Sequence, residues 1–297
     1  MLAADWFVAG ASDLAARMNV PPIVIGAIVL GFGTSAPELV VSTMAAVQHE
    51  VDLGLGNIVG SNVANLTLVL GVAVLIRPIE LPIGTKPRAL VCLTAVVLFG
   101  LLVQGKAEQY EGFVLLGAIV LALTLLIRMD TEEVAVDLPS MTGSSVAVWT
   151  QTLGGLMLTV ASAQIVVWAA THIAEQAGLA HGFIGFSLVA AGTSLPELVT
   201  VIAAARRDES DLIIGSLLGS NVFNSLAVGA GLFLAGDGVV ADVALQTQGS
   251  IAAVVVAFVV VVFMGPAGRG RLARPEGAVL LGGYVAVLAL LATSAGT

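Results

Sequence analysis

Residues 33 to 38 read GTSAPE, and residues 192 to 197 read GTSLPE. A second phrase follows each at the same distance, GSNVAN at 60 to 65 and GSNVFN at 219 to 224. The offset is 159 residues each time, and with it residues 33 to 65 match their counterparts at 18 of 33 positions without a gap. Shared apolar composition would not match the polar positions, so the pattern indicates an internal duplication.

The composition is that of a membrane protein. Hydrophobic residues make up 58% of the chain, its mean hydropathy is +1.04, and charged residues account for 10%, against roughly 25% in soluble domains. Several runs exceed the ~18 apolar residues that mark a transmembrane helix. The net charge is −9 and no basic stripe exists, which argues against nucleic-acid binding. The single Cys92 excludes an internal disulfide and a cysteine-based metal site.

The apolar runs predict an all-α polytopic protein with ten transmembrane helices. They lie at about 2–16, 20–47, 53–76, 88–104, 110–127, 146–174, 180–205, 212–235, 243–264 and 276–294. The long polar stretch between the fifth and sixth runs divides the chain. We therefore expect a first five-helix repeat at 1–127, an acidic cytoplasmic linker at 128–145 and a second five-helix repeat at 146–297. An odd number of spans per repeat gives the two halves opposite orientations, which is an inverted repeat.

The loop charges predict the orientation of these spans. If the loop after the first span faces the cytoplasm, Lys106 is the single basic residue in the outer loops. The inner loops then hold Arg17, Arg77, Lys86, Arg88, Arg128, Arg206, Arg207, Arg269, Arg271 and Arg274. This positive-inside bias predicts a multi-pass protein of the cell inner (plasma) membrane with both termini outside.

The first span is short. Met1 to Arg17 would cover about 26 Å as a helix, less than the ~30 Å hydrocarbon core. Aligned by the offset, the second repeat's first span begins about fourteen residues earlier. We expect either a shortened or tilted first helix or a natural start upstream of the written one. The second is favoured because duplicated units should start alike.

Two carboxylates lie deep within predicted spans. Glu38 and Glu197 end the duplicated phrases, and no Lys or Arg lies near their depth. A charge at the bilayer centre costs at least ~2.5–3.5 kcal/mol on insertion scales, so these carboxylates need protons or bound metal cations. A second interpretation is that Ser35 with Glu38, and Ser194 with Glu197, form capping boxes that only restart a broken helix.

The surrounding backbone also favours cations. Each phrase places a glycine and a proline inside a span, and proline frees a carbonyl one turn earlier. Freed carbonyls at this depth must line a cavity or meet a ligand. Carbonyl, hydroxyl and carboxylate oxygens together suit hard cations such as Ca²⁺ or Na⁺.

Polar residues also recur along the span that follows each phrase. Two stripes have four-residue spacing, namely Asn57, Ser61 and Asn65, and Ser216, Ser220 and Asn224. Stripes that face inward could complete an oxygen cage. The alternative for the neighbouring Asn62 and Asn221 is a hydrogen bond between helices.

On these motifs the sequence resembles the cation/calcium exchanger superfamily, in particular its prokaryotic sodium/calcium-exchanger-like members. GTS-x-PE and GSN-x-x-N are similar to the family's two alpha repeats, here residues 31–65 and 190–224, and the ten-span layout covers nearly the whole chain. The resemblance implies an antiporter, not an enzyme, with no cofactor and with inorganic cations as its partners in the lipid bilayer. The ligands that it implies are side chains of Glu38, Glu197, Thr34, Ser35, Thr193, Ser194, Ser61, Ser220, Asn65 and Asn224, with backbone carbonyls of Gly31 and Ala190.

The leading hypothesis is exchange of Ca²⁺ for Na⁺ by alternating access. Several family members carry Asp at one of the positions held here by Asn65 and Asn224, so this site has two formal charges, which balance one Ca²⁺. The alternatives are an antiporter of Ca²⁺ and H⁺ or of other cations, a passive channel, and an intramembrane hydrolase with two catalytic carboxylates. The hydrolase is disfavoured because nothing else in the sequence marks a nucleophile or a water-activating metal.

Overall fold

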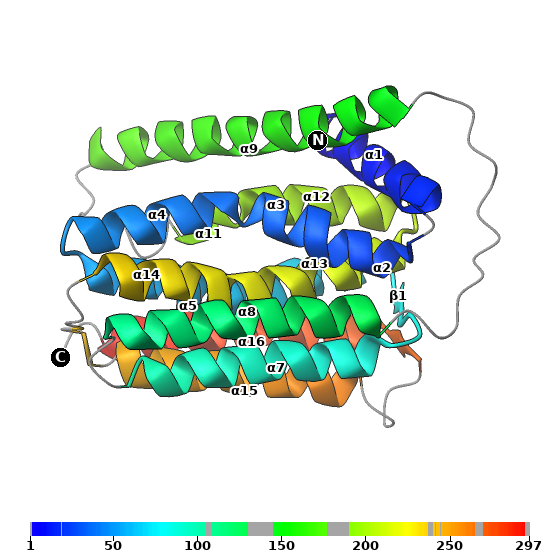
Figure 1. Cartoon of the computed structure of the whole chain (residues 1–297). Coiled ribbons are helices and arrows are strands. Elements are labelled where there is room, and N and C mark those ends of the chain that lie inside the picture. The colour runs from blue at the N-terminus through cyan, green and yellow to red at the C-terminus, as the bar shows by residue number, and fades with distance from the viewer. Residues whose placement is uncertain are drawn as a thin grey trace.

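The computed structural model describes residues 2–18, 20–104, 108–129, 145–176, 190–236, 240, 242–243, 245–264 and 270–294. Most of the predicted linker at 128–145 therefore lies outside the described residues. The described chain is mostly helical, as predicted, and the long helices run side by side along one bundle axis (Figure 1). An antiparallel pair of two-residue strands, β1 (Ile79–Glu80) and β2 (Arg271–Leu272), was not predicted.

The helices of the first half follow the predicted spans closely. They are α1 (Leu2–Met18), α2 (Pro22–Ile25), η1 (Gly26–Gly31), α3 (Phe32–Thr34), α4 (Ala36–Val47), α5 (Val51–Ala64), η2 (Asn65–Val69), α6 (Leu70–Ile76), α7 (Thr85–Leu102) and α8 (Gln109–Arg128). The label η marks a π-helical turn.

The helices of the second half are α9 (Ser145–Gln176), α11 (Ala190–Thr193), α12 (Leu195–Arg206), α13 (Ser210–Phe223), η4 (Asn224–Val228), α14 (Gly229–Ala235), η5 (Leu245–Gly249), α15 (Ser250–Phe263) and α16 (Arg274–Ser294). Within the described ranges, six helices are long and apolar enough to cross a membrane. The number is seven if Pro22–Thr34 and Ala36–Val47, bent by 42° at their junction, count as one broken span.

The duplication in the sequence is also a duplication of local structure. α4 and α12, α5 and α13, η2 and η4, and α6 and α14 begin and end at positions 159 residues apart. The turns between the paired helices match as well, because His49 and Asp208 both have a positive φ, of 63° and 64°. α4 and α12 run in opposite directions along the bundle (Figure 1).

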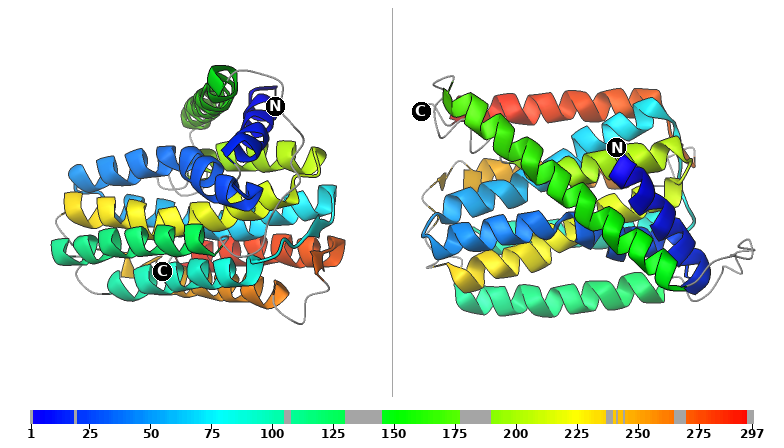
Figure 2. Two further views of the ribbon diagram at one scale, coloured as in Figure 1. Left: turned by 45° about the vertical axis from the view of Figure 1, so that its right-hand side comes forward. Right: turned by 90° about the horizontal axis from the view of Figure 1, so that it is seen from above.

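Two helices form a separate layer over the bundle. α9 crosses the other helices obliquely, with α1 alongside it (Figure 2). Their backbones touch where glycines leave room, since a Cβ on Gly10 would lie 2.7 Å from the Thr152 nitrogen and one on Gly155 would lie 2.6 Å from the Phe7 Cα. α1 has 17 residues and α9 has 32, so the predicted difference in length between the two helices is present.

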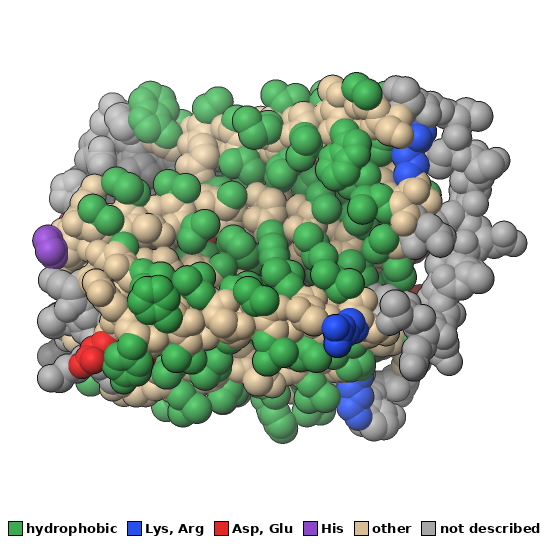
Figure 3. All heavy atoms as spheres, viewed as in Figure 1, with side chains coloured by type: hydrophobic (Ala, Val, Ile, Leu, Met, Phe, Trp, Pro, Cys, Tyr) green, Lys and Arg blue, Asp and Glu red, His purple; other side chains and the backbone are tan. Residues whose placement is uncertain are grey.

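The basic residues gather at one end of the bundle. The helix ends that carry Lys or Arg in the described ranges meet at the right-hand side of Figure 1, and the basic side chains visible in Figure 3 lie there. Hydrophobic side chains cover much of the face of the bundle that Figure 3 shows. β1 and β2 join the two halves at this end, and Arg77 forms an exposed ion pair with Asp208 at 2.6 Å. This arrangement is that of a multi-pass membrane protein.

Candidate cation-binding site

The broken helices place both glutamates at helix N-termini in the middle of the bundle. Ser35 and Ser194 have nearly identical non-helical backbone angles, −86° and 6° against −84° and 4°, and new helices begin directly after them. Glu38 and Glu197 lie in the first turns of these helices, where the helix dipole favours a negative charge. Both carboxylates are fully buried.

The capping-box interpretation is wrong. As N-cap residues, Ser35 and Ser194 make no side-chain hydrogen bond to their own helices. The Ser35 hydroxyl instead donates to Glu197 Oε1 at 2.8 Å, across the two halves of the chain. A capping box does form at the start of α8, where the Glu111 carboxylate accepts from the Glu108 backbone N–H. The two deep glutamates therefore need another explanation.

Other predicted ligands surround the glutamates and use their hydroxyl hydrogens within the protein. Ser61 donates to Glu38 Oε1 at 3.4 Å, Ser220 to the Gly31 carbonyl at 3.0 Å, and Thr34 to the Leu30 carbonyl at 2.7 Å. A hydroxyl carries one hydrogen and two lone pairs. Once the hydrogen is donated, the lone pairs remain for a positively charged ligand.

Several predicted ligand atoms have no hydrogen-bond partner in the described chain. They are Glu38 Oε2, Glu197 Oε2, Ser194 Oγ, and the side-chain oxygens and nitrogens of Asn65 and Asn224. Each of these side chains is at most 3% exposed. Buried polar atoms in proteins almost always have a partner, so unpaired oxygens that gather around two buried carboxylates indicate a place for a cation.

The charge around the site is negative. Among the described residues, neither Glu38 nor Glu197 has a basic partner within 4.0 Å, and no group of three or more His, Cys, Asp or Glu side chains could hold a metal ion. An ion here would have two carboxylates and otherwise neutral oxygens. Two of the π-helical turns, η2 and η4, begin at Asn65 and Asn224, and π-bulges are frequent at functional sites.

Close helix crossings hold the two halves together at this depth. A Cβ on Gly31 would lie 2.8 Å from the Ser216 carbonyl oxygen and 2.8 Å from the Ser220 nitrogen, and one on Gly219 would overlap the Ala27 backbone. η1 and α13 therefore touch backbone to backbone. This contact brings the Gly31 carbonyl within reach of the Ser220 hydroxyl.

The structure brings most of the predicted residues into one region, and their role as cation ligands stays a prediction. Ala190 begins the described part of the second broken helix, and the role of its carbonyl stays a prediction. The interhelical hydrogen bond expected of Asn62 is confirmed, because its amide donates to Ser225 Oγ at 2.9 Å. For Asn221 it is wrong, because that amide donates to the Leu217 carbonyl of its own helix.

Sequence reasoning gave too little weight to a second layer of polar residues behind the site. The Asn57 amide donates to the Glu38 carbonyl at 3.3 Å and to Ser42 Oγ at 2.9 Å, and Asn57 Oδ1 accepts from the Thr193 hydroxyl at 2.9 Å. Asn57 was recognised only as part of a polar stripe, and Ser42 was missed. The sequence does mark Ser42, because it is a serine four residues after Glu38 in an apolar helix.

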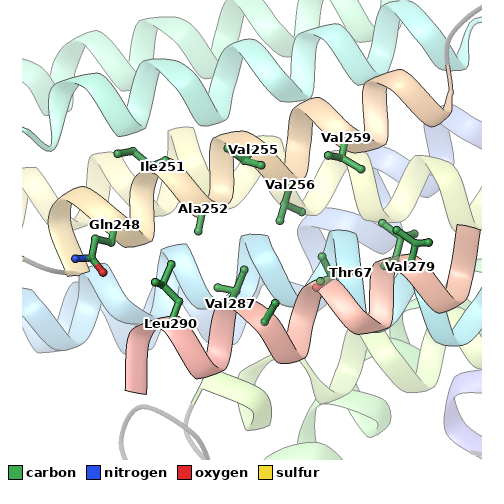
Figure 4. Close-up of a pocket in the computed structure, with 13 residues that line it drawn as sticks. Thr67, Gln248, Ile251, Ala252, Val255, Val256, Val259, Val279, Val287 and Leu290 are labelled. Atoms are coloured by element: carbon green, nitrogen blue, oxygen red, sulfur yellow. The ribbon is translucent and has the colours of Figure 1, made fainter. Parts of the chain in front are cut away.

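A groove between α15 and α16 is separate from this site. Aliphatic side chains line most of it, with Gln248 at one end and Thr67 of η2 at its floor (Figure 4). Neither glutamate lines it. The polar centre itself is closed, since its side chains are almost completely buried.

Comparisons with known proteins agree with this geometry. The sodium/calcium exchanger protein family profile matches residues 1–128 and 132–293. "Putative antiporter CaxA" of Alkalimonas amylolytica is 35% identical over 305 residues, which cover 98% of this chain and 94% of that protein. "Sodium/calcium exchanger MaX1" of Methanosarcina acetivorans is 30% identical, with 97% and 93% covered.

A similar structure has also been solved. It is the sodium-calcium exchanger NCX_Mj soaked with 2.5 mM Na⁺ and 0.1 mM Sr²⁺, which matches this chain with a TM-score of 0.85 and 29% sequence identity, over 97% of this chain and 93% of that one. The fold, the buried acidic centre and the family profile lead to one conclusion. The chain belongs to the sodium/calcium exchanger family, and it is a membrane transporter rather than an enzyme.

Proposed function

We propose that this exchanger moves Ca²⁺ against Na⁺ through a single buried site, at which the two ions compete. The proposed ligands are oxygens of Glu38, Glu197, Thr34, Ser35, Thr193, Ser194, Ser61, Ser220, Asn65 and Asn224, with the carbonyls of Gly31 and Ala190. Ca²⁺ takes 6–8 oxygen ligands, and this set is large enough to supply them. The observation that carries the proposal is the group of buried, unpaired oxygens around Glu38 and Glu197.

The exchange follows from the charge of the site. Two carboxylates balance one Ca²⁺, whereas the empty site carries two negative charges that are costly to move across a bilayer. The site therefore changes its exposure from one side to the other only when it is loaded. This coupling makes the protein a carrier rather than a channel.

We further propose that ten spans form two inverted five-helix repeats, residues 1–127 and 146–297, joined by the cytoplasmic linker at 128–145. The opposite directions of α4 and α12 support the inversion, which suits alternating access around a midplane site. The gathering of basic residues at one end of the bundle supports an orientation with that end in the cytoplasm. We place the protein in the cell inner (plasma) membrane with both termini outside.

A test of the counter-ion uses the full-length protein in sealed vesicles. Ca²⁺ uptake is measured with an outward Na⁺ gradient, with an outward H⁺ gradient, and with neither. The proposal predicts uptake that requires the Na⁺ gradient and stops when K⁺ replaces Na⁺ inside. Uptake driven by the H⁺ gradient alone would instead establish a Ca²⁺/H⁺ antiporter, and uptake with neither gradient would establish a channel.

A further inference from the structure

We propose that Phe32 and Phe223 form an aromatic gate between the cation site and the basic end of the bundle, and that an ion reaches the site from that end only when the two rings separate. The inference rests on the ion site proposed above and deepens it, because it assigns the side on which access is controlled. The ring centroids lie 4.6 Å apart, with an angle of 37° between the ring planes. Neither residue is among the proposed ligands.

Both rings lie beside proposed ligands. Phe32 begins α3, which ends at Thr34, and Phe223 ends α13, immediately before Asn224. α2 follows the basic last turn of α1, and α13 follows that of α12, so both spans run from the basic end of the bundle toward its middle (Figure 1). The side chains of an α-helix lean toward the N-terminus of that helix. Both rings therefore lean from the ligands toward the basic end.

The two halves of the chain differ at these positions. With the offset of 159 residues, Phe32 corresponds to Ala191 and Phe223 corresponds to Ala64. The phrases GSNVAN and GSNVFN differ only at this alanine and phenylalanine, so the motif itself does not require a ring there. In an inverted repeat, corresponding positions approach the site from opposite sides. The sequence therefore places two bulky rings on the route from the basic end and two alanines on the opposite route.

The pair lies where the helices of both spans are interrupted. Phe32 is three residues before the non-helical Ser35, and Phe223 directly precedes the π-helical turn η4. Both phenylalanines are partly exposed. A second aromatic pair, Phe99 with Phe233, is 2% and 1% exposed in the hydrophobic core. A pair that only filled the core would be buried in that way, whereas partial exposure leaves the rings beside the site room to move apart.

Closed rings oppose the passage of a cation. A hydrophobic constriction excludes water, and an ion that enters it loses its hydration without gaining ligands. The contact between two aromatic rings adds only a modest stabilisation beyond the area that they bury. Such a pair is therefore closed for most of the time and still opens readily, which are the properties of a gate.

The test measures how fast a thiol at the site reacts with a small membrane-impermeant thiosulfonate, added to everted or to right-side-out vesicles that contain the full-length protein. Cys92→Ala removes the single thiol of the chain, and Ser35→Cys supplies one at the site. In separate vesicles, Lys86→Cys shows which preparation presents the basic end to the reagent, because Lys86 is exposed at that end.

The gate predicts an effect on one side of the membrane. In the Ser35→Cys background, Phe32→Ala and Phe223→Ala should each raise the labelling rate from the basic end about two- to tenfold, the size of one aromatic contact. The rate from the opposite side should stay unchanged. Phe99→Ala is the matched control, because it removes an aromatic contact of the core, and it should leave both rates as they are.

Leucine variants cover the case in which the alanine variants do not fold. Phe32→Leu and Phe223→Leu keep much of the apolar volume but remove the ring, and they should still raise the labelling rate from the basic end, by a smaller factor. An unchanged rate from that end, or an equal rise from both sides, would overturn the inference, since the rings would then support only the general packing. Labelling needs neither Ca²⁺ nor a Na⁺ gradient, so a failure of the proposed exchange in the transport assay is distinguished from a failure of the gate.

Discussion

Replacing either buried glutamate by glutamine should abolish Ca²⁺ transport. In the structure Glu38 Oε1 accepts from Ser61 and Glu197 Oε1 accepts from Ser35, while both Oε2 atoms have no partner. A glutamine can keep the first contact with its oxygen, which directs its NH₂ group to the position of Oε2. The variant thus loses a charge and presents a donor where the cation needs an oxygen.

The expected loss follows from Coulomb's law. Two unit charges about 4 Å apart interact by ~4 kcal/mol at an effective dielectric constant near 20, so Ca²⁺ and one carboxylate interact by roughly 8 kcal/mol. Solvation of the free ion offsets part of this energy. If the variant loses about 3 kcal/mol of binding free energy after this offset, its Ca²⁺ affinity falls by more than about a hundredfold, since each 1.4 kcal/mol changes the dissociation constant tenfold.

The assay is Na⁺-driven Ca²⁺ uptake in vesicles over a range of Ca²⁺ concentrations. Glu111→Gln is the matched control, because Glu111 is also a buried glutamate but lies in the capping box of α8, where glutamine is an accepted substitute. It should transport like the parent. The reasoning would be refuted if Glu38→Gln or Glu197→Gln kept a Ca²⁺ half-saturation within about threefold of the parent.

Three further outcomes are expected. Asn65→Asp or Asn224→Asp adds a third buried carboxylate. Because like charges disfavour the fully ionised site, inhibition of Ca²⁺ uptake by H⁺ should extend to higher pH. An unchanged pH profile would mean that these positions do not face the ion. Gly215→Ala would push a Cβ into the Ile23 carbonyl and should destabilise the protein by about 1–3 kcal/mol in thermal unfolding, whereas Gly117→Ala, with open space at its Cβ, should not. Arg77→Ala breaks an ion pair whose side chains are 52% and 58% exposed, so it should lower the free energy of unfolding by less than ~1 kcal/mol. A larger loss of stability would show that this contact between the halves is more than a surface ion pair.

The sequence alone predicted two kinds of feature: motifs that occur twice in the chain, and residues whose place in a membrane span has a large energetic effect. In the first half of the chain, the helices begin and end within a few residues of the apolar runs, because apolar length dominates insertion into a bilayer. The duplicated phrases identified Glu38 and Glu197, since a carboxylate in an apolar span has few explanations. The family resemblance, confirmed by the comparisons, added the class of transporter.

Only the tertiary structure decided which polar atoms form hydrogen bonds with one another. No spacing in the sequence shows that Ser35 donates to the glutamate of the other half, or that Ser194 leaves its own helix uncapped. The same holds for Asn57 and Thr193, which lie 136 positions apart. Such partners are brought together by glycine-lined helix crossings between the halves, and hydrogen bonds over a few ångströms depend on packing that local sequence does not encode.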